Sequence, residues 1–127
     1  MKHTDKLKEF ELHLREKYSE DISSFSFQLW SGISTYYFLS EEFIEKYSNQ
    51  VDWRRICAYQ KLSEQFIEKH SDEVNWKFIS GSQDLSEEFI MNHINKLDID
   101  WLMFNMNISK DIKCKIENEI NLLKEII

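Results

Sequence analysis

Proline is absent from this chain of 127 residues, and glycine occurs only at Gly32 and Gly81. Proline breaks helices and glycine supplies the positive φ of tight turns, so their scarcity means that few segments demand either. A sheet-rich domain of this length normally carries more turn residues. The composition therefore predicts an all-helical protein.

Cysteine is almost as scarce, because Cys57 and Cys114 are the only two and form no recognisable motif. We expect both to be small, buried, reduced residues rather than partners in a disulfide. The chain also lacks the apolar core of a secretory signal near its start, and it has no apolar run long enough to span a bilayer. These features predict a cytoplasmic protein.

Apolar residues, in contrast, are plentiful. They make up 42% of the chain, and aromatic residues alone make up 14%. This supply is enough to bury a core, which argues against disorder. The length leaves room for one domain but not for two ordinary ones. We expect a single domain that spans residues 1–127.

A period of 23 residues organises the middle of the chain. Units of this length cover residues 39–61, 62–84 and 85–107, and a weaker fourth copy begins at Ile108. Aligned, they give one column of serine, one of phenylalanine or isoleucine, and one of aspartate or asparagine. These columns hold Ser40, Ser63, Ser86 and Ser109; Phe43, Phe66, Phe89 and Ile112; and Asp52, Asn75, Asp98 and Asn121. Such a period is typical of a helical repeat protein.

Each unit predicts two short helices. The serine column supplies the N-cap of the first helix, and the aspartate or asparagine column supplies the N-cap of the second. Glutamates such as Glu41 follow in the first turn, where the helix dipole favours negative charge. Helices this short cannot hide their apolar faces alone, so neighbouring units must stack. We therefore predict a short α-solenoid of helix-turn-helix repeats.

The two ends of the chain are expected to close this stack. Residues 1–38 contain an opening helix from Asp5 to Tyr18 and a degenerate, shorter repeat in which Trp30 corresponds to Trp53. Residues 108–127 form a C-terminal capping helix, in which the two helices of a unit are merged. The third unit departs from the pattern, since Ile99 stands where tryptophan is usual and Trp101 follows two positions later.

The segments LSEEFIEKY (39–47), VDW (51–53) and LSEQFIEKH (62–70) resemble tandem repeats in uncharacterised proteins of bacteriophages, prophages and large DNA viruses. The resemblance covers residues 39–107. It implies a helical-repeat architecture and a viral origin, and hence a bacterial host cell as the place of action. Small acidic phage proteins are often inhibitors of host defence, so the resemblance also suggests an anti-CRISPR-like inhibitor.

The net charge of −7 is concentrated in the repeats, because residues 39–107 carry thirteen acidic and seven basic residues. Such a surface repels nucleic acid and favours a basic protein partner, for example a host defence nuclease. We expect the partner-binding face to comprise Glu41, Glu42, Glu64, Asp72, Glu73, Glu87 and Glu88. The leading hypothesis is a non-enzymatic protein-binding module.

A second hypothesis is a nucleic-acid- or nucleotide-binding repeat protein that uses Arg54, Arg55, Lys77 and nearby aromatic residues. The acidic total argues against it, and the recurrence of tryptophan with isoleucine at helical spacing predicts core positions for Trp30, Trp53 and Trp76. A homodimer could form through exposed apolar residues of the third unit, namely Met103, Phe104 and Met106.

A third hypothesis is an enzyme or metal site around His70 and His93, which share one column of the alignment. Tyr47 occupies the same column in the first unit, so the position favours a flat ring and a packing role. A zinc site needs three or four ligands, and the sequence places no others beside these two. We therefore predict no catalytic residue, metal ligand or cofactor.

Overall fold

The computed structural model describes residues 3–126, and within this range it contains only helices, with no strand. The all-helical prediction is confirmed. The elements are α1 (His3–Tyr18), η1 (Ile22–Ser24, a 3-10 helix), α2 (Phe27–Tyr36), α3 (Glu41–Lys46), α4 (Trp53–Tyr59), α5 (Glu64–Lys69), α6 (Trp76–Ser82), α7 (Glu87–Asn92), α8 (Ile99–Phe104) and α9 (Lys110–Ile126). None of these helices is long and apolar enough to cross a membrane.

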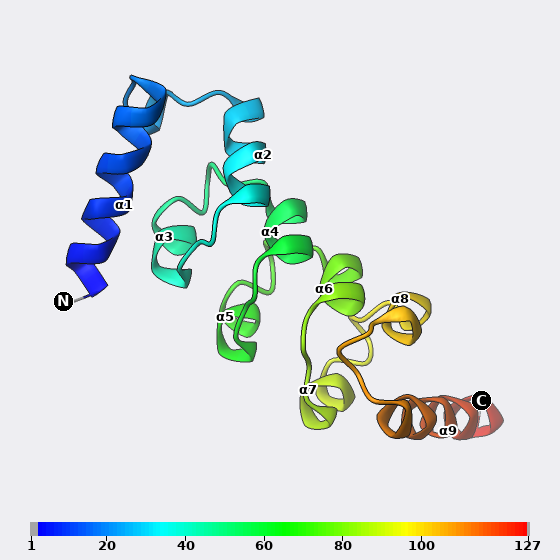
Figure 1. Ribbon diagram of the computed structural model, residues 1–127. Coiled ribbons are helices and arrows are strands. Elements are labelled where there is room, and N and C mark those ends of the chain that lie inside the picture. Colours follow the sequence, from blue (N-terminus) through cyan, green and yellow to red (C-terminus); the bar gives the residue numbers. More distant parts are fainter. Residues whose placement is uncertain (1–2, 127) are drawn as a thin grey trace.

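The helices lie in two layers (Figure 1). Helices α3, α5 and α7, each the first helix of its 23-residue unit, form what we call the first layer. Helices α2, α4, α6 and α8 lie on the other side and form the second layer, in which each helix packs against the next. The longer helices α1 and α9 lie at the two ends, so the termini are far apart. Every short helix is thus flanked by neighbours from the adjacent units.

The helix starts lie where the sequence predicts them. The hydroxyls of Ser40, Ser63 and Ser86 accept from the backbone N–H three residues later, each at 3.1 Å. Asp52, Asn75 and Asp98 cap the second-layer helices in the same way. Helices of six or seven residues have hardly any internal hydrogen bonds, so satisfying an unpaired N–H at each start is a large part of their local stability.

The core is a continuous apolar seam between the two layers. Phe43, Phe66 and Phe89 are each at most 6% exposed, which confirms the predicted shared interior. The isoleucine that follows each phenylalanine is fully buried, and so is one aliphatic residue of each second-layer helix: Ile44, Ile67, Ile90, Ile56, Ile79 and Leu102. Burying one such side chain contributes about 1.5–3 kcal/mol, so the seam supplies the stability that the short helices lack.

Aromatic rings join each unit to the next. Trp53 lies against Phe66 and His70 of the following unit, with ring centroids 6.2 and 5.4 Å apart. Trp30 packs in this way on Phe43 and Tyr47, and Trp76 on Phe89 and His93. At the last junction the corresponding positions are aliphatic, and Ile99, Ile112 and Ile116 all belong to the core. Trp30 is buried in the core and Trp53 and Trp76 are partly buried against it, in agreement with the prediction, and Ile99 meets aliphatic partners where the tryptophans meet aromatic ones.

In the segment before Leu39, where a degenerate repeat is predicted, α2 continues the second layer, and the 3-10 helix η1 is the only element between α1 and α2. The hydrogen bonding of the Trp30 indole differs from that of the other two tryptophans. The indole N–H groups of Trp53 and Trp76 donate to the carbonyl oxygens of Ser48 and Ser71, five residues earlier. The indole N–H of Trp30 is buried without a hydrogen-bond partner among the described residues.

Buried amides form a second link between units, which the sequence analysis did not anticipate. The side-chain amide of Gln60 donates to the carbonyls of Ser34 and Tyr37 at the end of the preceding second-layer helix, at 2.9 and 2.6 Å. Twenty-three residues later, Gln83 donates to the carbonyls of Cys57 and Gln60 at the same two distances. The third copy uses asparagine: Asn105 donates to the carbonyls of Ser80 and Gln83.

The amide oxygens complete this amide ladder, which we define as Gln60, Gln83 and Asn105. Oε1 of Gln60 accepts from the N–H of Leu39, and Oε1 of Gln83 accepts from the N–H of Leu62. Each glutamine therefore satisfies three backbone groups that the helix ends leave without partners. All three side chains are buried, so water cannot replace these bonds.

The two cysteines differ in environment. Cys57 is buried in α4, and its Sγ accepts from the N–H of Asn75, a role that the hydroxyls of Ser34 and Ser80 fill at equivalent positions. Burial raises the pKa of the Cys57 thiol to about 11. The expectation of burial is wrong for Cys114, which is exposed. It lies two residues from both Ile112 and Ile116, and hence on the opposite side of α9 from the face that packs.

The amide ladder gives a stability prediction. Gln83→Leu keeps the size of the side chain but leaves the carbonyls of Cys57 and Gln60 and the N–H of Leu62 unpaired in the interior. We expect the free energy of unfolding, measured by urea denaturation, to fall by about 3 kcal/mol. The control is Gln65→Leu at an exposed position of α5, where we expect a change within about 0.5 kcal/mol. Equal effects of the two substitutions would show that the ladder contributes nothing.

Candidate functional site

The predicted acidic residues lie mainly at the starts of the first-layer helices. Glu41 accepts from both the N–H and the hydroxyl of Ser63 in the next unit, at 2.6 and 3.0 Å. Glu64 makes the same two bonds to Ser86, again at 2.6 and 3.0 Å. Glu87 makes no such bond to Ser109, the equivalent serine of the fourth copy, and instead pairs with Lys115 of α9 at 3.4 Å. These glutamates therefore help to fasten each first-layer helix to the next.

This role leaves most of their charge in place. The donors on Ser63 and Ser86 are neutral, so the hydrogen bonds orient the carboxylates of Glu41 and Glu64 without cancelling their charge. Glu42 and Glu88 occupy the adjoining positions and are exposed. The structure thus brings Glu41, Glu42, Glu64, Glu87 and Glu88 to one edge of the first layer, which we call the acidic edge.

Asp72 and Glu73 do not belong to this edge. They are exposed in the turn that follows α5, at the opposite end of that helix from Glu64. Glu73 is also engaged within the chain, since its carboxylate contacts Nδ1 of His70. The seven residues predicted as one face therefore divide between the two ends of the first-layer helices.

His70 and His93 lie where the flat-ring column predicts, packed on Phe66 and Phe89 with centroids 4.4 and 4.1 Å apart. Nε2 of each imidazole faces a glutamate of the preceding first-layer helix: Glu45 at 3.6 Å from His70, and Glu68 at 3.2 Å from His93. Nδ1 of His93 donates to the carbonyl of Phe89 at 2.7 Å. The two rings serve as packing and pairing groups between units.

No group of three or more histidine, cysteine, aspartate or glutamate side chains within the described part of the chain is arranged to hold a metal ion. Each histidine meets carboxylates from its own or the preceding unit, so the two imidazoles do not converge on a common point. The metal or catalytic hypothesis therefore gains no geometric support from these residues.

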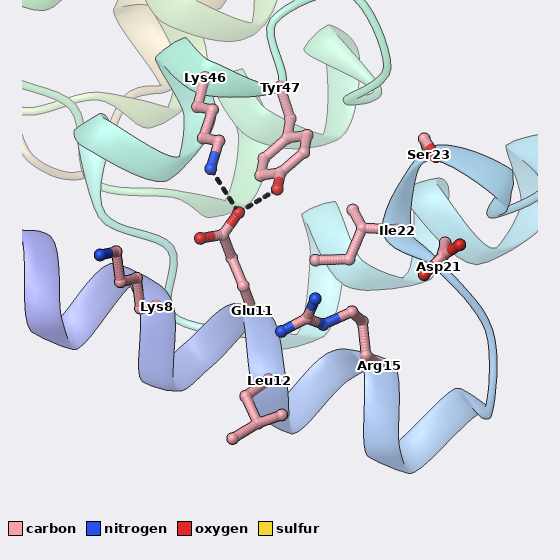
Figure 2. A pocket seen from close by; sticks show the side chains of 9 residues that line it. All are labelled: Lys8, Glu11, Leu12, Arg15, Asp21, Ile22, Ser23, Lys46 and Tyr47. Atoms are coloured by element: carbon pink, nitrogen blue, oxygen red, sulfur yellow. Dashed lines mark hydrogen bonds and ion pairs between the residues drawn. The ribbon is translucent and has the colours of Figure 1, made fainter.

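A cavity of about 620 Å³ lies where α1 and η1 meet the first layer (Figure 2). Glu11 points from α1 toward α3, where its carboxylate accepts from Nζ of Lys46 at 2.7 Å and from the hydroxyl of Tyr47. Lys8 and Arg15 lie on the same helix beside it. Glu11 is buried, whereas Lys8 and Arg15 are exposed.

The surroundings of Glu11 and Tyr47 keep Glu11 charged and Tyr47 neutral. Burial alone would raise the pKa of Glu11, but hydrogen bonds from Lys46 and Tyr47 and the positive charges of Lys46 and Arg15 lower it below its ordinary value of 4.5. Burial and the neighbouring Glu11 carboxylate raise the pKa of Tyr47. Tyr47 therefore stays a donor and Glu11 an acceptor near neutral pH. The hydrogen bonds from Lys46 and Tyr47 to Glu11, at the centre of the cavity, therefore hold α1 against the first layer.

The sequence analysis missed Glu11 because it lies outside the repeats, so no column marks it. The only signal is its place on the helical stripe of α1, next to Phe10 and three residues before Leu14, among residues that pack inward. A glutamate on an apolar stripe indicates a buried partner, but the sequence does not show which residue supplies it.

Searches of family models, curated proteins and solved structures gave no match to this chain.

The Glu11 cluster gives a pH prediction. Because the pKa of Glu11 is lower in the folded chain than in the unfolded one, its charge stabilises the fold above a pH of about 4.5, and this contribution is lost as the pH falls further. Glu11→Gln should reduce the free energy of unfolding near neutral pH by about 1–2 kcal/mol. The difference from the unaltered protein should shrink toward zero at strongly acidic pH.

Urea denaturation at neutral and acidic pH measures both effects, with Glu9→Gln, an exposed position on the same helix, as the control. A loss for Glu11→Gln that is equally large at both pH values would contradict the assignment of a charged Glu11 in the fold.

Proposed function

We propose that this chain is a non-enzymatic protein-binding module, a short solenoid that presents an acidic edge to a basic partner. The solenoid part rests on the recurrence of equivalent bonds at a spacing of 23 residues. Glu41 and Glu64 bind the next serine N-cap in the same way, and Gln60 and Gln83 bind the preceding helix end in the same way. Bonds that repeat at the sequence period favour one shared unit structure.

The acidic edge is the observation that carries the binding proposal. Helices α3, α5 and α7 contain seven acidic residues and only two basic ones, Lys46 and Lys69. Both lysines are already paired, with Glu11 and Glu45. The carboxylates of Glu41 and Glu64 are held in place by bonds to the next unit, so a partner need not pay to order them. An ordered row of uncancelled negative charge is suited to a basic protein surface.

The most concrete form of this proposal is a phage-encoded inhibitor that covers the basic nucleic-acid channel of a host defence nuclease, as anti-CRISPR proteins do. Two observations support it: the net charge of −6 on residues 39–107 and the likeness of the repeats to those of viral proteins. Competition with nucleic acid for a basic channel requires a surface that carries the same sign of charge as the phosphate backbone.

Charge reversal tests the acidic edge. Glu42→Lys with Glu88→Lys alters two exposed carboxylates that take no part in the bonds between units. We expect capture of basic proteins from a nuclease-treated bacterial lysate to fall roughly tenfold, mainly through slower association, and capture by the unaltered chain to weaken with salt. The matched control is Glu117→Lys with Glu119→Lys on exposed α9, which makes the same change in net charge.

Equal losses for the two double variants, or capture that salt does not weaken, would contradict the proposal. A separate experiment tests the proposal that the chain is a phage-encoded inhibitor. Expression in a bacterium protected by a CRISPR nuclease should restore plaque formation by a targeted phage, and the Glu42→Lys, Glu88→Lys variant should not restore it.

A further inference from the structure

The outer side of the second layer has a different character from the acidic edge. A cavity of about 210 Å³ between α4 and α6 is lined by Arg54, Arg55, Ala58, Tyr59 and Phe78. A second cavity of about 280 Å³ adjoins it and shares Ala58 and Tyr59, so that Tyr59 lies between the two. The Tyr59 ring is 60% exposed. The first cavity has no carboxylate in its lining.

Positive charge gathers on this side. Four of the seven basic residues between positions 39 and 107 lie on or next to α4 and α6, namely Arg54, Arg55, Lys61 and Lys77. Two acidic residues flank the same helices: Asp52, the buried cap of α4, and Asp84, which lines the second cavity. Arg54 has a distant contact of 3.9 Å with its own helix cap, Asp52. Arg55, Lys61 and Lys77 form no ion pair with any residue that the structure describes. These cations are therefore available to an external anion.

Trp101 extends the surface onto α8. Its ring meets Phe78 edge-on at 5.4 Å and lies under Nζ of Lys77 at 5.6 Å. A Cβ at Gly81 would come within 2.8 Å of Cε3 of this ring, so glycine is needed here to let the indole lie against the backbone of α6. Trp101 is still 39% exposed. The two-residue displacement of tryptophan in the third unit thus moves the ring from the seam to the outer surface.

We infer that this surface, which comprises Arg54, Arg55, Tyr59, Lys77, Phe78 and Trp101 and which we call the basic-aromatic face, binds single-stranded nucleic acid. The guanidinium and ammonium groups bind successive phosphates, and the exposed rings of Tyr59 and Trp101 stack on bases. The pairing of cations with exposed rings selects this ligand, because an acidic peptide would use the cations but leave the rings without flat partners. The inference goes beyond the proposed protein-binding function and uses the opposite layer.

The net negative charge of the chain does not oppose this binding strongly. The helices of the first layer hold seven acidic and two basic residues, whereas α4, α6 and α8 hold three basic residues and one acidic one, Asp100. The first-layer helices are therefore strongly acidic, whereas the second-layer helices carry a small excess of basic residues, with Asp52, Asp84 and Asp98 at their ends. At physiological ionic strength, exposed charges more than about 8–10 Å away are largely screened, so the local cations dominate the field at the face.

The test is a titration of a short fluorescent oligothymidine, followed by fluorescence anisotropy. We expect binding at low salt that weakens roughly fourfold for each doubling of salt, as three phosphate contacts predict. Arg55→Glu and Tyr59→Ala should each weaken binding about tenfold. Both residues are exposed, so neither variant should disturb folding. The controls are Lys110→Glu on α9 and Phe27→Ala at the start of α2, which remove an exposed charge and an exposed ring elsewhere.

Competition experiments identify the ligand class. Heparin, a polyanion without bases, should compete less well than the oligonucleotide, and free thymidine monophosphate should compete only weakly. No anisotropy change at low salt would overturn the inference. So would equal competition by heparin, which indicates a general polyanion site, or equal competition by the monophosphate, which indicates a mononucleotide pocket. Unchanged binding by Tyr59→Ala would also overturn it, whatever the fate of the acidic edge.

Discussion

The structure depends on one constraint: helices of six or seven residues cannot satisfy their own ends or bury their own faces. Every first-layer and second-layer helix therefore relies on its neighbours. The apolar seam of Phe43, Phe66 and Phe89 removes the faces from water, and it accounts for most of the stabilisation. Because the seam is continuous from α1 to α9, stability is a property of the stack and not of any single unit.

Hydrogen bonds between units fix the register of neighbouring helices, which the apolar contacts of the seam alone would not define. Apolar contacts are not directional, so two short helices could slide against each other at little cost. The amide ladder prevents this, because Gln83 reaches the carbonyls of Cys57 and Gln60 only in one register. Leaving those groups unpaired in the interior would cost about 1–3 kcal/mol each. The carboxylate bonds from Glu41 to Ser63 do the same at the surface of the first layer.

The sequence was sufficient to predict features that follow from local chemistry repeated at a fixed spacing. The serine and aspartate caps and the buried phenylalanines could be read from their columns, since their roles depend on the helix they belong to. The amide ladder was equally periodic but was not predicted. A glutamine at a helix end resembles any solvated turn residue, and its role depends on carbonyls that lie 23 and 26 residues away.

The two surface features differ in the same way. The acidic residues could be predicted as a group from composition, but their division between the ends of the first-layer helices required the fold, and so did the separate position of Asp72 and Glu73. The basic-aromatic face was underestimated, because the net charge of the repeats is dominated by the acidic first layer and hides the local cations of the second. The sequence shows Trp101 only as a departure from the repeat pattern, and its exposure and its contacts with Phe78 and Lys77 place it on the outer surface.

Within each unit, inward-facing and outward-facing residues have different roles, and this difference has a functional consequence. Inward positions are constrained by the seam and the ladder, so a substitution there destabilises the stack. Outward positions such as Glu42 and Arg55 contact little else and can change charge at small cost in stability. A stack of this kind can therefore carry different chemistry on its two layers, because the exposed side chains of each surface lie on different helices. The acidic edge of the first layer and the cations and rings of the second can then be altered independently by substitution.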